Sequence, residues 1–208
     1  MPTLLEKIEA HAARRLVLPE SRAPRSELAR YKTFLKLEHH RLKMLHRAGS
    51  GGREVCHGQA AVFDVLLRYL LDSVQRDAPS PSAARKVTFA LVALGGYGRG
   101  ELNPQSDIDI MFLHSGELVS SGKPHPYLAS LTDGLLYTLW DLGLKVGHSV
   151  RSVDDCVRVA NSDMQSKTSL IEARLIAGDK ELFQRMQAVV LAKCVRGYEN
   201  SYIAARTA

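Results

Sequence analysis

The stretch from residue 87 to residue 113 constrains the fold more than any other part of the sequence. Two apolar runs flank a glycine-rich segment: Val-Thr-Phe-Ala-Leu-Val-Ala-Leu at 87–94, and a second run from Ile108 to Leu113. Short apolar runs bounded by glycines are typical of strands that are buried on both faces. The stretch therefore predicts a strand, a glycine-rich turn and a second strand.

Two carboxylates, Asp107 and Asp109, stand at the start of the second predicted strand with Ile108 between them. Side chains alternate along a strand, so we expect the two acids to project together while Ile108 points into the core. Adjacent carboxylates repel each other unless a cation lies between them, and hard divalent ions such as Mg²⁺ prefer oxygen ligands. The alternative is that these acids only solvate the end of a strand; the neighbouring glycine turn favours the metal site.

The turn carries four glycines within six residues, at positions 95, 96, 98 and 100. Glycines allow close approach of a ligand to the backbone, and exposed backbone N–H groups can cradle an anion. Arg99 can add a charge-assisted contact to phosphate, and Ser106 can assist. We therefore expect Gly95, Gly96, Arg99 and Ser106 to bind phosphate beside a metal held by the two acids, which is what nucleotidyl transfer needs.

The pattern Gly-Gly, ten residues, Asp-x-Asp resembles the signature of the DNA polymerase β-type nucleotidyltransferase superfamily. Residues 95–109 more narrowly resemble the bacterial PII uridylyltransferases, and two later blocks, at 144–156 and 170–183, agree with that family in order and spacing. The resemblance implies a cytoplasmic, Mg²⁺-dependent enzyme of nitrogen regulation. It would transfer UMP from UTP to a tyrosine hydroxyl of the protein PII and release pyrophosphate, with Asp107 and Asp109 as catalytic and metal-binding residues.

The sequence departs from the family in two ways. Members of the superfamily often carry a third carboxylate on the strand after the helix, but here that predicted strand, 145–152, has none. His148 or Ser149 could face the site, and Asp154 or Asp155 could substitute. The resembled enzymes also continue into a hydrolase domain of the HD type and two ACT domains, so we expect a fragment or a minimal relative without uridylyl removal or glutamine sensing.

The charge and composition of the chain limit the kinds of molecule that it is expected to bind. The chain has 208 residues and a net charge of +6, and residues 1–85 hold 15 Lys and Arg against 9 Asp and Glu. A basic region can attract nucleic acid or an acidic protein. Here the charges are scattered among apolar residues with few aromatics, which favours a solvated helical surface over nucleic-acid binding. No apolar run approaches the roughly 20 residues that a membrane span needs, and three widely spaced cysteines suit reduced thiols in the cytoplasm.

We predict an α/β (α+β) fold with a small mixed sheet covered by helices. The domains we expect are a helical N-terminal region at 1–84, a nucleotidyltransferase domain at 85–195 and a helical tail at 196–208; the oligomeric state stays open. Periodicity and caps predict helices at 1–17, 26–47 with Ser26 as N-cap, 54–76, 127–142, 153–159, 166–177 and 180–193, and a third strand at 145–152.

Two alternatives remain open from the sequence. One is an adenylyltransferase or other nucleotidyltransferase with a different acceptor. The other is a non-catalytic regulatory module that binds nucleotide. Substitution of Asp109 by Ala distinguishes the non-catalytic module from both nucleotidyltransferase hypotheses, because a catalytic domain would lose turnover and a scaffold would keep its partner.

Overall fold

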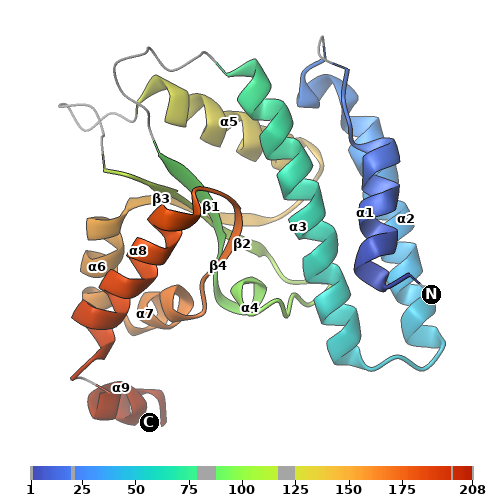
Figure 1. Cartoon of the computed structure of the whole chain (residues 1–208). Coiled ribbons are helices and arrows are strands. Elements are labelled where there is room, and N and C mark those ends of the chain that lie inside the picture. Colours follow the sequence, from blue (N-terminus) through green and yellow to red (C-terminus); the bar gives the residue numbers. More distant parts are fainter. Residues whose placement is uncertain (1, 20–21, 79–87, 117–124, 198, 208) are drawn as a thin grey trace. The chain divides into compact units, whose positions relative to one another are not determined.

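A computed structural model describes the chain except residues 1, 20–21, 79–87, 117–124, 198 and 208 (Figure 1). The fold is mixed, with helices and one four-stranded sheet, as predicted. The elements in chain order are α1 (Leu4–Arg15), η1 (Pro24–Glu27), α2 (Leu28–Arg47), α3 (Gly52–Asp77), β1 (Phe89–Ala93), α4 (Gly95–Gly98), β2 (Ile108–His114), α5 (Pro126–Asp141), β3 (Val146–Ser152), α6 (Val153–Ser162), α7 (Met164–Ile171), β4 (Arg174–Gly178), α8 (Lys180–Val190), η2 (Leu191–Val195) and α9 (Glu199–Thr207).

The sheet has the order β3-β2-β1-β4, so the two strands of the motif lie at its centre. β1 pairs antiparallel with β2, with Ala93 opposite Ile110, and antiparallel with β4, with Ala93 opposite Arg174. All five residues of β1 are buried, which confirms the prediction of a strand covered on both faces. The predicted start of this strand, Val87, lies outside the described residues.

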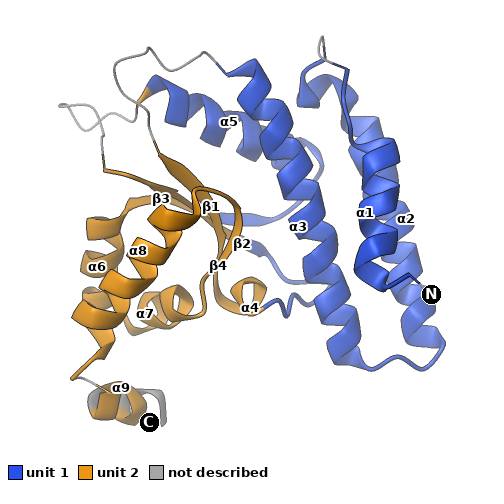
Figure 2. Ribbon diagram, viewed as in Figure 1, with its two compact units in different colours: residues 1–81, 100–108, 126–147 blue, residues 82–99, 109–125, 148–208 orange. Residues whose placement is uncertain are grey.

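The chain divides into two compact units, and neither is one continuous segment (Figure 2). The first contains residues 1–81, 100–108 and 126–147, and the second contains residues 82–99, 109–125 and 148–208. The predicted domain boundary at residues 84–85 lies outside the described residues, and the predicted partition stays a prediction.

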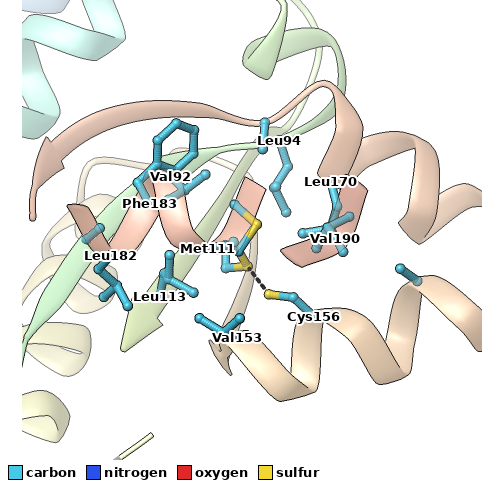
Figure 3. Close-up of a cluster of buried hydrophobic side chains, with 14 of the residues drawn as sticks. Val92, Leu94, Met111, Leu113, Val153, Cys156, Leu170, Leu182, Phe183 and Val190 are labelled. Carbon is cyan, nitrogen blue, oxygen red and sulfur yellow. Dashed lines mark hydrogen bonds between the residues drawn. The ribbon is translucent and has the colours of Figure 1, made fainter. Parts of the chain in front are cut away.

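The second unit is built on an apolar core between the sheet and helices α6, α7 and α8 (Figure 3). Alternate residues of β1 and β2 point into this core, α6 and α8 contribute several buried residues each, and α7 contributes Leu170. The thiol of Cys156 lies 3.6 Å from the sulfur of Met111, and burial raises the pKa of Cys156 to about 11. The core residues are Ala90, Val92, Leu94, Met111, Leu113, Val153, Cys156, Ala160, Leu170, Ala173, Leu182, Phe183, Met186, Val190 and Cys194.

The first unit is helical, with α3 in contact with α1, α2 and α5. Its buried polar centre is Glu38, which is fully buried. His11 Nδ1 lies 2.5 Å from Glu38 Oε1, and Arg41 donates to Glu38 Oε2 at 2.7 Å. The His11–Glu38 contact joins α1 to α2, and Arg41 supplies a positive charge beside the buried carboxylate from within α2. No helix in the described part of the chain is long and apolar enough to span a membrane.

Two local predictions are wrong. Ser26 is not a helix N-cap: it lies inside η1, and its hydroxyl donates to the Ala23 carbonyl. Pro24 fixes the first turn of η1, which precedes α2. Residues 166–177 are not one helix, because α7 ends at Ile171 and the chain continues into the strand β4. Pairing with β1 stabilises the strand more than the helix propensity of these residues favours a helix.

Three other predicted ends are confirmed or refined. Ser152 caps α6 in a capping box with Asp155, and Asp179 caps α8 by accepting from the Leu182 N–H at 2.7 Å. The third strand begins one residue later than predicted, at Val146.

Candidate functional site

The two acids of the motif belong to different units, because the division falls between Ile108 and Asp109. Asp107 is exposed and directly precedes β2, and Asp109 is the exposed second residue of β2. Ile108, between them, is 2% exposed, as predicted. In the first unit the Ile108 N–H donates to the Lys145 carbonyl at 3.0 Å, which fixes the backbone just after Asp107.

In the second unit, Asp109 lies beside the start of the glycine turn. The Leu94 N–H donates to the Asp109 carbonyl at 3.0 Å, which continues the pairing of β1 with β2 to the last residue before Gly95. Residues i and i+2 share a face of a strand, so Asp109 lies on the face of Met111, one of the core residues of the second unit. The carboxylate and the turn are therefore positioned by the same pair of strands.

The glycine turn is a single helical turn, α4, and not an open loop. Gly95 has φ of +55°, a conformation that other residues adopt at a cost. The N–H groups at the start of a helical turn have no intrahelical acceptor, and those of Gly95 and Gly96 donate to no residue in the described part of the chain. The backbone donors expected to face phosphate are thus available.

Gly98 is required by a close approach of the chain. A Cβ at this position would come 2.4 Å from the carbonyl oxygen of Glu172 and 3.0 Å from that of Ala93. The segment between α7 and β4 therefore packs directly on the backbone of the turn, and α7 contacts α4.

Arg99 is half-exposed, and its Nη1 donates to Glu172 Oε2 at 2.7 Å. Sequence reasoning expected Arg99 to bind phosphate but did not find this partner, 73 residues away. It also missed Arg174, which donates from Nε to the Gly98 carbonyl at 3.2 Å and from Nη2 to the Tyr97 carbonyl at 3.1 Å. Glu172 and Arg174 both lie within the block 170–183, and no local pattern in that block indicates their contacts with the turn.

Ser106 is exposed and belongs to the first unit. Its N–H donates to the Asn103 carbonyl at 3.0 Å. It lines a cavity of about 230 Å³ with Phe63, Gln59 and His39 among its walls. The Gln59 amide lies 3.2 Å from His39 Nε2, and burial lowers the pKa of His39. Ser106 is therefore close in sequence to the acids, but it belongs to the first unit, whereas Arg99 belongs to the second.

The candidates for a third acid are mostly engaged elsewhere. Asp155 accepts from the N–H and the hydroxyl of Ser152, and it pairs with Arg158. Burial raises the pKa of Asp155, but these hydrogen bonds and the Arg158 charge outweigh it, so the pKa is lowered. Asp154 and His148 are exposed, and the buried Ser149 hydroxyl has no partner among the described residues.

No group of three or more His, Cys, Asp or Glu residues is placed to hold a metal within the described ranges. Mg²⁺ takes carboxylate oxygens together with substrate phosphates. Asp107 and Asp109 are exposed carboxylates, so their donor atoms are of the kind that this ion takes.

Comparison with known proteins gives one family and several relatives. The family model described as Glutamate-ammonia ligase adenylyltransferase matches residues 12–131. A bifunctional uridylyltransferase/uridylyl-removing enzyme of Novosphingobium aromaticivorans is 41% identical over 78% of this chain, and that of Azospirillum brasilense is 38% identical over 77%. The enzyme of the same description from Erythrobacter litoralis is 38% identical over 76%. The matched region spans about 17% of the length of each of these relatives.

Proposed function

Because the chain belongs to the glutamate-ammonia ligase adenylyltransferase family, we propose that it carries the nucleotidyl-transfer site of a PII uridylyltransferase. The reaction is transfer of UMP from UTP to a tyrosine hydroxyl of PII, with release of pyrophosphate. The relatives named for uridylyl transfer support the choice of UTP. The observation that carries the proposal is the backbone hydrogen bond from the Leu94 N–H to the Asp109 carbonyl, which holds Asp109 beside the glycine turn.

The chain's own groups have separate roles in this proposal. The N–H groups of Gly95 and Gly96 bind phosphate oxygens, as exposed backbone donors in such turns do. Arg99 contacts the same phosphates through its guanidinium, which carries five N–H donors and a fixed positive charge. Ser106, in the segment just before the two acids, assists in binding the triphosphate.

Asp107 and Asp109 would hold Mg²⁺, together with phosphate oxygens of UTP. When bound, this ion would neutralise phosphate charge and lower the pKa of the attacking hydroxyl. The tyrosine oxygen forms a bond to the α-phosphorus, the bond from that phosphorus to the oxygen bridging to the β-phosphate breaks, pyrophosphate leaves with that oxygen, and the hydroxyl proton passes to solvent water. Arg99 stabilises the charge that develops on the departing pyrophosphate.

Transfer of label from α-³²P UTP to PII tests the proposal, with a PII variant whose acceptor tyrosines are replaced by Phe as control. We expect label on PII that depends on Mg²⁺ and disappears with Asp109→Asn. No label on PII with the intact chain, under conditions in which the protein is folded, would contradict the assignment of PII as acceptor.

Adenylyl transfer is the second candidate, because the matching family is described by that activity. α-³²P ATP in the same assay distinguishes the two. Preference for ATP by more than about tenfold in kcat/KM, or about 1.4 kcal/mol in transition-state binding, would move the assignment to adenylyl transfer.

A further inference from the structure

Arg174 is tied to the glycine turn from two sides. Its backbone is the register partner of Ala93 in the β1–β4 pairing, two residues before Gly95. Its side chain reaches the far end of the turn, where it donates to the carbonyls of Tyr97 and Gly98 at 3.1 and 3.2 Å. The guanidinium also lies 5.5 Å from the centre of the Tyr97 ring.

A helix of one turn cannot hold its shape alone, because nucleation of a helix is unfavourable. The last carbonyls of a helix lack intrahelical donors, and a cation at that end is favourable. Arg174 supplies both the donors and the charge. One planar guanidinium therefore fixes where α4 ends, and with it the direction of the backbone at Arg99.

The residue two positions earlier acts on the same turn. The Glu172 carboxylate holds Arg99 at 2.7 Å, and the Glu172 carbonyl is the atom that a side chain at Gly98 would strike. The segment 172–174 thus fixes the turn by main-chain packing, by an ion pair and by hydrogen bonds.

We infer that Arg174 is a positioning residue for the nucleotide's triphosphate: it holds the turn 95–98 and Arg99 in the arrangement that binds phosphate, without touching the nucleotide itself. The inference rests on the proposed function. Misplacement of binding groups by a lost supporting contact commonly costs about 10–100-fold in affinity or activity.

The test compares three variants of the full 208-residue chain. Arg174→Gln removes the charge and the fork of donors. Arg174→Lys keeps the charge but not the planar fork. Arg185→Gln is the matched control, because Arg185 is an exposed arginine of α8 in the same unit. The readouts are the dissociation constant for Mg²⁺-UTP and amide hydrogen exchange of residues 94–100 without nucleotide, both where circular dichroism shows a folded protein.

We expect Arg174→Gln to raise the dissociation constant by about tenfold or more and to speed exchange in the turn, with Arg174→Lys intermediate. Arg185→Gln should match the wild type in both readouts. Unchanged nucleotide affinity in Arg174→Gln, whatever its thermal stability, would show that Arg174 is only structural and would overturn the inference. Absence of binding by the wild type would refute the proposed function and, with it, the role of Arg174 toward triphosphate.

Discussion

Substitution of Gly98 by Ala tests the packing of the glycine turn most sharply. The added methyl would lie 2.4 Å from the Glu172 carbonyl oxygen and 3.0 Å from that of Ala93. Ordinary contacts of a Cβ begin near 3.4 Å, so the backbones must separate by about 1 Å on the Glu172 side. Both obstructing atoms belong to the main chain of paired or packed segments, so no side-chain rotation can relieve the clash.

The magnitude follows from two opposing terms. Overpacking of a closely packed site costs about 1–3 kcal/mol. Alanine recovers about 0.5–1 kcal/mol relative to glycine in a helix, because glycine loses more backbone freedom on folding. We therefore expect Gly98→Ala to lower the free energy of unfolding by about 1–2 kcal/mol and to weaken nucleotide binding, since Arg174 would be displaced from the carbonyls it contacts.

Urea unfolding measures the first effect as a lower midpoint at unchanged slope. Gly52→Ala is the control, because a Cβ at Gly52 meets nothing within 4 Å and its φ is not positive; it should raise stability by about 0.4–1 kcal/mol. Wild-type stability in Gly98→Ala would refute the argument that the Glu172 backbone lies against the turn.

Two further predictions concern buried polar groups. Burial lowers the pKa of His114, so the unfolded chain takes up a proton near pH 6.5 that the folded chain does not. The free energy of unfolding should therefore fall as the pH is lowered from 7 to 5.5, and it should fall less in His114→Asn. The control His40→Asn, at an exposed position, should follow the wild type. Parallel pH curves of unfolding free energy for His114→Asn and the wild type would contradict this. Glu38→Gln should cost about 1.5–3 kcal/mol in urea unfolding, because it removes the charge of a fully buried carboxylate that accepts from the partly exposed Arg41 and contacts His11; stability equal to the wild type would show that this carboxylate is dispensable.

The central strands were predictable because their signals are local. The run before Gly95 is uniformly apolar, and Ile108 is buried between two exposed acids, so burial and alternation can be read directly from consecutive residues. The spacing of glycines and acids likewise predicted that Asp109 and the turn would lie together, since a short loop joins two paired strands.

The fourth strand was not predictable from its own residues. The segment Leu-Ile-Glu-Ala-Arg-Leu-Ile-Ala at 170–177 contains good helix formers, and only its pairing with β1 makes the second half a strand. The same reason hid Glu172 and Arg174 from sequence analysis. Their contacts to the turn span 73 to 77 residues, so they depend on the sheet order and on no short-range pattern.

Isothermal calorimetry of nucleotide binding tests the central claim most directly. UTP and ATP are titrated with and without Mg²⁺ into the 208-residue chain and into the Asp107→Asn/Asp109→Asn double variant, whose exposed substitutions should leave the fold intact. The account predicts Mg²⁺-dependent binding with preference for UTP, and its loss in the double variant. Equal binding by both proteins, or no metal-dependent binding of either nucleotide by the intact chain, would contradict a nucleotidyl-transfer site at these carboxylates.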